Sequence, residues 1–309
     1  MNWGCKMEYA HSPVLLEECI QVLQPRLGKL IVDCTVGLGG HSEAILNTGA
    51  KMVCIDKDSE ALEASKKRLI SFSKQVVFVR GDFRELAGAL DAHGIKKVDG
   101  VLMDLGVSSL QLDKPERGFS YRSDAPVDMR MDDRSDLTAM KILNTWPVSQ
   151  LKMILYEYGE ERYAPQISAA IEKHRPINTT GELCELILRT VPAKARRKDK
   201  HPARRTFQAL RIAVNDEMGA LEQGLAEGLE RLKPGGRMAV ISFHSIEDRI
   251  VKQFFAIHSR GCVCPTSFPE CACGKQPQIK LLKRCEPGNS EIENNPRAAS
   301  ARLRGAEKL

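Results

Sequence analysis

Four strand-length apolar runs follow one another in the first third of the chain, and helical spacing follows each of the first three. The runs span residues 30–32, 52–55, 76–79 and 98–103. Strands that alternate with helices build a parallel sheet with right-handed crossovers. Because the runs are apolar on both faces, we expect each strand to lie between two layers of helices. The sequence therefore predicts an open α/β sheet of the doubly wound type.

The alternation then stops and later resumes. Residues 105–136 are rich in Gly, Ser, Asp and Pro, and helical spacing recurs at 137–143, 149–158, 166–173 and 180–190. One long helix is predicted from Thr206 to about residue 232, ended by Pro234-Gly235-Gly236. Further elements are expected at 238–243, 246–255, 279–283 and 301–304, and Ser12-Pro13 is expected to open the first helix. We predict a sheet domain over 1–109 and 206–309, with a mainly helical unit inserted at 110–205.

A glycine-rich loop comes directly after the first strand and opens a helix. Residues 33–42 read Asp-Cys-Thr-Val-Gly-Leu-Gly-Gly-His-Ser. Glycines let a backbone turn sharply and approach a nucleotide-like ligand. The pattern Gly-x-Gly-Gly differs from the dinucleotide fingerprint, which makes a nicotinamide dehydrogenase the weaker interpretation. S-adenosyl-L-methionine has no pyrophosphate, and its binding requires a glycine backbone that can approach it closely. The structural alternative is a tight turn that binds no ligand.

The other strand ends carry polar or aromatic side chains. Asp56 ends the second strand, where a carboxylate accepts hydrogen bonds from ribose hydroxyls. Phe83 follows the third strand and is placed to flank an adenine. Asp104 ends the fourth strand. Ligands of open α/β sheets bind at these carboxyl ends, so the four features together predict one cofactor site.

Asp104 is also the candidate catalytic residue. If the chain methylates a cytosine amine, which is a poor nucleophile, a carboxylate that accepts a hydrogen bond from the amine N–H would help as positive charge develops on the nitrogen. The alternative is a carboxylate that only binds cofactor or caps a helix. The aromatic side chain that stacks on the base would be Phe119, Tyr121 or Phe243.

Two further polar residues have both a functional and a structural interpretation. His244 follows the fifth strand and is a second catalytic candidate, either for proton removal or for RNA contact. A hydrogen-bonded loop histidine is the alternative. Asn215 could reach the cytosine edge, although a solvated or capping role is more common for such a residue.

The charge and the cysteine content of the chain limit its possible partners and ligands. The net charge is +6, and residues 194–205 hold seven Lys or Arg against one Asp, which predicts either a phosphate-binding patch or a solvated loop. Phe207 beyond it is expected in the core.

No apolar run is long enough for a membrane span and no secretory signal is evident, so a cytoplasmic location is expected and disulfides are not. Cys262, Cys264, Cys271 and Cys273 could bind structural zinc, but their C-x-C spacing is unusual, and no metal is assigned.

Several motifs together resemble the MraW family, the small-subunit ribosomal RNA methyltransferases H. The matching stretches are 11–18, 33–42, 103–111, 117–120, 128–132, 158–162, 205–211, 241–249 and 295–298. The resemblance covers nearly the whole chain.

The resemblance implies a class I, seven-stranded S-adenosylmethionine-dependent methyltransferase fold. It implies methylation of N4 of a decoding-centre cytidine in 16S ribosomal RNA, with the inserted helical unit facing the RNA. The cofactor contacts it implies are Gly39, Gly40, His41, Asp56, Phe83, Asp104 and Gln111. A non-catalytic assembly factor of the small subunit and an N4-methyltransferase of another nucleic acid are the alternatives. The sequence leaves open the nucleotide position, naked RNA or assembled subunit as substrate, and the oligomeric state, a homodimer included.

Overall fold

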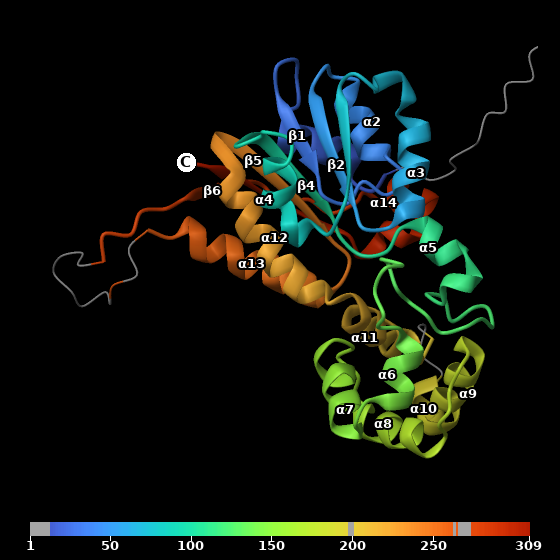
Figure 1. Cartoon of the computed structure of the whole chain (residues 1–309). Helices are drawn as coiled ribbons and strands as arrows, with labels where there is room; N and C mark the ends of the chain where they lie inside the picture. Colours follow the sequence, from blue (N-terminus) through green and yellow to red (C-terminus); the bar gives the residue numbers. More distant parts are fainter. Residues whose placement is uncertain (1–12, 197–200, 262–263, 265–272) are drawn as a thin grey trace, which may run out of the picture.

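A seven-stranded sheet organises the larger part of the molecule (Figure 1). The computed structural model describes residues 13–196, 201–261, 264 and 273–309. The strands lie in the order β3-β2-β1-β4-β5-β7-β6. Their bounds are β1 Leu30–Asp33, β2 Lys51–Asp56, β3 Val76–Arg80, β4 Val98–Asp104, β5 Leu232–Ser242, β6 Ile279–Leu281 and β7 Arg302–Lys308. The first five strands run parallel, and β7 pairs antiparallel with both β5 and β6, so β7 alone runs against the other strands of this sheet, which confirms the class I methyltransferase fold.

Helices cover both faces of the sheet, as the doubly apolar strands predict. One face packs on α1 (Leu16–Leu23), α2 (Gly40–Leu46) and α3 (Ser59–Arg68). The other packs on α4 (Leu86–Asp91), α12 (Glu217–Arg231) and α13 (Ser245–Ser259). The short α14 (Asn289–Asn294) precedes β7. Burial of both strand faces leaves only the strand ends accessible to a ligand.

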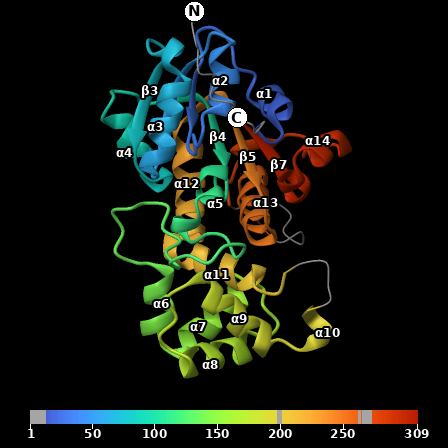
Figure 2. The ribbon, with the colours of Figure 1, turned by 90° about the vertical axis from the view of Figure 1, so that its right-hand side faces the viewer.

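The inserted segment forms a helical unit with a hydrophobic core of its own. Its helices are α6 (Ala139–Thr145), α7 (Val148–Glu157), α8 (Ala164–Lys173), α9 (Thr180–Thr190) and α10 (Ala193–Arg196), and α5 (Ser109–Asp113) precedes them. Figure 2 shows these helices gathered below the sheet, with α11 (Arg204–Asn215) between the two parts. Phe207, Leu210 and Val214 of α11 belong to the core of the helical unit, so that core extends past residue 205.

The predicted long helix from Thr206 is wrong. Asp216 adopts a left-handed conformation (φ 45°, ψ 48°) and separates α11 from α12. Arg84 donates hydrogen bonds to the side chain and the carbonyl of Asp216, at 2.8 and 3.2 Å. The break lets α11 pack on the helical unit while α12 packs on the sheet.

Two smaller boundaries also differ from the sequence prediction. The first helix begins at Leu16 because Leu15 is left-handed (φ 53°), so Pro13 precedes the helix, and Ser12 lies outside the described residues. Pro234-Gly235-Gly236 lies within β5 and does not end a helix, since α12 ends at Arg231. In the described part of the chain, no helix is long and apolar enough to cross a membrane.

Candidate active site

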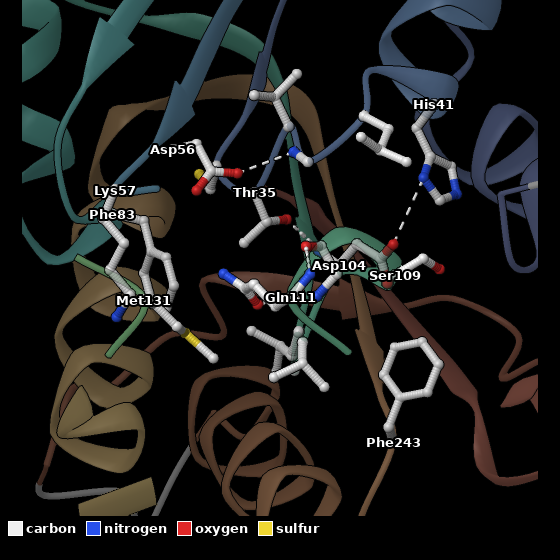
Figure 3. Close-up of a pocket in the computed structure, with 18 of the residues that line it drawn as sticks. Thr35, His41, Asp56, Lys57, Phe83, Asp104, Ser109, Gln111, Met131 and Phe243 are labelled. Carbon is white, nitrogen blue, oxygen red and sulfur yellow. Dashed lines mark hydrogen bonds and ion pairs between the residues drawn. The ribbon is translucent and has the colours of Figure 1, made fainter. Parts of the chain in front are cut away.

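A cavity of about 210 Å³ opens at the carboxyl ends of the parallel strands (Figure 3). Six of the seven predicted cofactor residues line it: Gly40, His41, Asp56, Phe83, Asp104 and Gln111. The structure therefore brings together side chains from four separate strand ends. Lining residues that the sequence did not single out include Thr35, Gly37, Lys57, Ser109, Met131 and Glu217.

The glycine loop presents Gly37 and Gly40 to this cavity, and Gly39 does not line it. Gly37 has a φ of +51°, a left-handed conformation that favours glycine, and it lines the cavity. A Cβ built on Gly39 would lie 3.3 Å from Ser65 and 3.4 Å from Leu69, both at the α3 end. The predicted contact of Gly39 with the cofactor is therefore not supported by its position. The motif alone could not tell which of its glycines faces the ligand.

The Asp56 carboxylate joins the loop to the second strand. Oδ2 accepts the backbone N–H of Gly37 at 2.9 Å, and Oδ1 accepts that of Asp58 at 2.9 Å. Each oxygen keeps a second lone pair that can accept a ribose hydroxyl. Burial raises the pKa of Asp56 to about 6, and the two backbone N–H groups only partly offset this effect.

Phe83, Lys57 and Met131 lie together at one end of the cavity (Figure 3). A Cβ on Gly224 of α12 would lie only 2.5 Å from the Phe83 ring, so a glycine is needed for the ring to take this place. Lys57 is paired with Asp82 at 3.2 Å, and Asp82 also accepts the N–H of Arg84. An apolar ring beside polar groups suits a flat heterocycle such as adenine.

Gln111 lines the cavity, but its amide is already engaged. Nε2 donates to Oδ2 of Asp58 at 2.8 Å, and Oε1 accepts the N–H of Ser108 at 3.1 Å in a capping box that starts α5. Arg117 also donates to Oδ2 of Asp58 at 2.8 Å. These bonds hold α5 against the start of α3, so Gln111 shapes the wall beside Asp104.

Asp104 lies at the other end of the cavity, with one oxygen unsatisfied. Its backbone N–H donates to Oγ1 of Thr35 at 2.7 Å, which fixes the end of β4 beside β1. Oδ2 lies 3.7 Å from Nδ1 of His41, and the buried Oδ1 has no hydrogen-bond partner among the described residues. Burial raises the pKa of Asp104 well above its usual value, and the charges of Asp33 and Glu247 raise it further.

His41 is neutral and does not compensate the charge of Asp104. Its Nε2 donates to the carbonyl of Val14 at 3.0 Å, since a carbonyl can only accept, and Nδ1 therefore turns a lone pair toward Asp104. Burial lowers the pKa of His41 to about 4.

A positively charged ligand fits the carboxylates of Asp56 and Asp104. Among the described residues, neither Asp56 nor Asp104 forms an ion pair with a Lys or Arg side chain. A buried carboxylate without a counter-charge is costly, and a positively charged ligand removes that cost. S-adenosylmethionine carries a sulfonium and an ammonium group, so the residues present match this cofactor.

Of the three predicted stacking aromatics, only Phe243 lines the cavity, on the side of Asp104 and Ser109 (Figure 3). Phe119 is 6% exposed in the core of the helical unit, and Tyr121 stacks on His201 at a centroid distance of 4.7 Å. Both rings are occupied by internal packing.

His244 lies at the N-cap of α13 and faces a second cavity, not the one that holds Asp104. Its Nδ1 accepts the N–H of Glu247 at 3.4 Å, and its Nε2 lies 3.1 Å from the Glu247 carboxylate. Glu247 accepts the N–H groups of Phe243 and His244 in return. The geometry supports the structural interpretation of His244 and does not support proton removal at Asp104.

Glu217, His244 and Glu247 bring three potential ligand atoms within 4.8 Å of one another. Arg211 already binds both oxygens of Glu217, each at 2.8 Å. Burial by itself would raise the pKa of Glu247, but His244, Arg211 and the N–H of Phe243 together lower it. This cluster is accounted for as an ion-pair network that joins α11, α12 and α13.

The geometry of Asn215 supports its structural interpretation over contact with the cytosine edge. Its Oδ1 accepts the N–H of Met131 at 2.7 Å, and its Nδ2 donates to the carbonyls of Met129 and Arg211, both at 2.8 Å. All of its hydrogen-bonding groups therefore hold the segment that carries Met131 over the cavity.

The remaining predictions concern the surface and the core. Phe207 is 4% exposed in the helical core, as predicted. Of the basic segment, residues 197–200 lie outside the described residues, whereas Arg204 and Arg205 line the second cavity. Cys262 and Cys271 also lie outside the described residues, so the zinc hypothesis stays a prediction.

Comparison with known proteins shows the family of this chain. Residues 8–309 match the model of the MraW methylase family. The Ribosomal RNA small subunit methyltransferase H of Carboxydothermus hydrogenoformans is 52% identical over 309 residues, covering 98% of this chain and 99% of that protein. The protein of the same name from Brevibacillus brevis is 47% identical over 311 residues, covering 98% and 99%. Among solved structures, an rRNA methylase from Streptococcus thermophilus is 12% identical with a TM-score of 0.44, covering 95% of this chain and 93% of that one.

Proposed function

The chain belongs to the MraW methylase family, and from this premise we propose that it methylates the exocyclic N4 amine of a decoding-centre cytidine in 16S ribosomal RNA. It is an S-adenosylmethionine-dependent methyltransferase, and its relatives are named for the small-subunit ribosomal RNA. The cytidine, its N4 atom and its place in the decoding centre are the proposal.

The observation that carries the choice of an amine is Asp104. A buried carboxylate oxygen without a partner lies in a cavity walled by Phe243, which leaves one acceptor free for an N–H group. A C5 carbon offers no such donor. A ribose hydroxyl offers an O–H, so the product analysis below has to separate an amine from a hydroxyl as the methylated group. Phe243 offers an aromatic face against which a pyrimidine can stack.

The cofactor supplies an activated methyl group on a positively charged sulfur. Asp56 would bind the ribose hydroxyls, and Phe83 with Met131 would flank the adenine. Asp104 is ionised when the cationic cofactor is bound, because an opposite charge nearby lowers the pKa of a carboxyl group. The carboxylate then accepts an N–H of the cytosine amine, orients the nitrogen lone pair, and stabilises the positive charge that develops on nitrogen. The proton leaves to Asp104.

The test compares ribosomal RNA from cells with and without the gene, complemented by the wild type or by Asp104→Asn. We expect one cytidine of the small-subunit RNA to carry N4-methylcytidine in the wild type only, by nuclease mapping with mass spectrometry against synthetic standards. 5-Methylcytidine or a 2′-O-methyl group at the affected site would contradict the proposal.

The same comparison separates the alternatives. An unchanged RNA with a defect in subunit assembly would indicate a non-catalytic assembly factor. Transfer of labelled methyl to DNA but not to RNA would indicate another nucleic acid. Gel filtration of the purified protein tests whether it forms a homodimer, and fractionation of cells tests the expected cytoplasmic location.

A further inference from the structure

A second cavity, of about 500 Å³, lies next to the Asp104 cavity and shares Phe243 with it as a wall. Four segments line it: the start of α11, the turn at Gly159 and Glu160, the β5–α13 junction, and residues 286–302. The cavity therefore spans the helical unit and the methyltransferase domain. The cofactor residues and Asp104 do not line it, so it has no evident role in binding S-adenosylmethionine.

Two arginines in this cavity carry unbalanced charge. Arg204 and Arg205 line it, the first half-buried and the second exposed. In the part of the chain that the structure describes, neither guanidinium forms a hydrogen bond or an ion pair. Most other arginines of the methyltransferase domain are paired, as Arg84, Arg237 and Arg304 are. A guanidinium left unpaired beside a cavity is a ready donor for an anion.

The carboxylates of the cavity do not cancel these charges. Glu160 is bound by Arg249 at 3.1 Å and by the hydroxyl of Ser245 at 2.8 Å. Glu286 is paired with Arg284 and lies 3.6 Å from Arg302. Each acid thus has its own cation, which leaves the charges of Arg204 and Arg205 to the cavity.

The N-terminus of α11 adds to the positive potential. Arg204 and Arg205 are the first residues of α11, and both line the cavity. The N-terminus of α13 is already capped by His244 and Glu247 and does not contribute. The N-terminus of a helix carries partial positive charge and favours phosphate, which supports the arginines.

We propose that the second cavity binds the sugar-phosphate backbone of single-stranded RNA beside the target nucleotide, with Arg204 and Arg205 as phosphate ligands. This inference rests on the proposed function, because it takes the target base to lie against Phe243. The strand would then pass from the arginines over Phe243, and only the target base would enter the Asp104 cavity. In this cavity the protein would recognise the RNA strand by the charge of its phosphates, because phosphate contacts carry no information about the base sequence.

The test measures binding of a fluorescein-labelled single-stranded oligoribonucleotide, one cytidine within a run of uridines, by anisotropy across a salt series. The variants are Arg204→Ala/Arg205→Ala and, to retain side-chain length, Arg204→Gln/Arg205→Gln. The matched control is Lys51→Ala/Lys96→Ala, which removes the same charge from exposed positions at the amino ends of β2 and β4, outside both cavities. Calorimetry with S-adenosylmethionine checks that each variant is folded.

We expect both arginine variants to bind RNA about tenfold or more weakly at low salt. Loss of two phosphate contacts should lower the salt slope by about 1.4 for a single strand. The lysine control and the affinity for S-adenosylmethionine should not change. Equal losses in the arginine and lysine variants, no loss in either, or equal displacement of the RNA by poly-glutamate would overturn the inference.

The two proposals fail separately. Normal RNA binding by the arginine variants, together with N4-methylcytidine as the wild-type product, rejects only the phosphate cavity. Weakened binding by these variants, with a different wild-type product, rejects only the cytidine assignment.

Discussion

Oδ2 of Asp56 accepts the backbone N–H of Gly37 at 2.9 Å, which joins the end of β2 to the loop that follows β1. The same carboxylate thus sets the conformation of the glycine loop and offers acceptors to the cavity. A substitution there changes both the loop and the ligand contacts, and the choice of variants has to separate the two effects.

Asp56→Ala should weaken S-adenosylmethionine binding by roughly tenfold or more. Loss of charge-assisted hydrogen bonds to a ligand costs on the order of 1.5–3 kcal/mol. Asp56→Asn keeps one oxygen acceptor, so its loss should be smaller. Asp91→Ala, which removes a surface carboxylate bound to Arg231, is the control and should bind normally. Calorimetry measures all three, and equal affinity of Asp56→Ala and the wild type would reject the ribose assignment.

Cofactor affinity should fall as the pH drops from 7 to 5. Burial raises the pKa of Asp56 to about 6, and the pKa of Asp104 is raised as well. Protonation removes the negative charges that attract the cationic cofactor, so binding at pH 6 should release protons. Calorimetry at pH 6 in two buffers of different ionisation enthalpy measures this release. Binding that is independent of pH and releases no protons would contradict the fit of a cation to these carboxylates.

Asp33 and Asp56 should contribute to the stability of the cofactor-free protein with the opposite pH trend. Asp33 and Asp56 both have a pKa of about 6 in the folded chain, against an ordinary value of 3.8. The folded state therefore binds protons more tightly than the unfolded state between about pH 4 and pH 6. The contribution of these groups to the free energy of unfolding is present below pH 4 and is lost as the pH rises through 6. Urea titrations of the wild type and Asp33→Asn over this range measure the contribution.

The strands could be predicted from the sequence, but the break at Asp216 could not. The five parallel strands lie in the sheet as their apolar runs indicate, because burial on both faces leaves a strong local signal. Apolar residues continue at helical spacing across Asp216, from Val214 to Met218 and Leu221. Arg84, which is 132 residues away in the sequence, binds the left-handed turn at Asp216. A local sequence pattern cannot indicate a contact across such a separation.

The candidate site shows the same limit. Asp56, Phe83 and Asp104 could be placed from their positions at strand ends, since topology brings such ends together. Which glycine of the loop faces the cavity depends on the packing of α3 against Gly39. The capping role of His244 depends on Glu247, three residues later, and a capping pattern that begins with histidine gives a weak signal.

Asn215→Ala should weaken cofactor binding without touching the cofactor. The amide makes three hydrogen bonds, two of them to Met129 and Met131, and Met131 lies over the cavity beside Phe83. Without them the segment loses its attachment to α11, and stability should fall by about 1–3 kcal/mol. Asn144→Ala is the matched control, since Asn144 makes two comparable bonds to Ile177 within the helical unit. Thermal unfolding should show a loss in both variants, and calorimetry a weaker cofactor affinity in Asn215→Ala alone. Equal affinities would show that Met131 does not act on the cofactor site.

The role of Asp104 is tested by Asp104→Asn, which keeps the size of the side chain and removes its charge. If the carboxylate accepts an N–H of the cytosine amine, its interaction strengthens as positive charge develops on the nitrogen. We expect the rate of methyl transfer at saturating RNA and cofactor to fall by about 10²-fold or more. RNA affinity should change much less, because the neutral amine gains little from the charge in the ground state.

Asp104 also lines the cofactor cavity, so single-turnover kinetics must separate its two roles. The rate of Asp104→Asn is followed at rising cofactor concentration until it no longer changes. A rate that stays low at saturation assigns the chemical step to the carboxylate. A rate that returns to the wild-type value would make Asp104 a cofactor-binding residue only. His244→Ala is the companion variant, and because its side chain faces the second cavity, we expect its rate at saturating cofactor and RNA to stay within a few-fold of the wild type, far from the loss in Asp104→Asn. A loss in His244→Ala as large as in Asp104→Asn would show that the histidine, not the carboxylate alone, acts on the transferred proton.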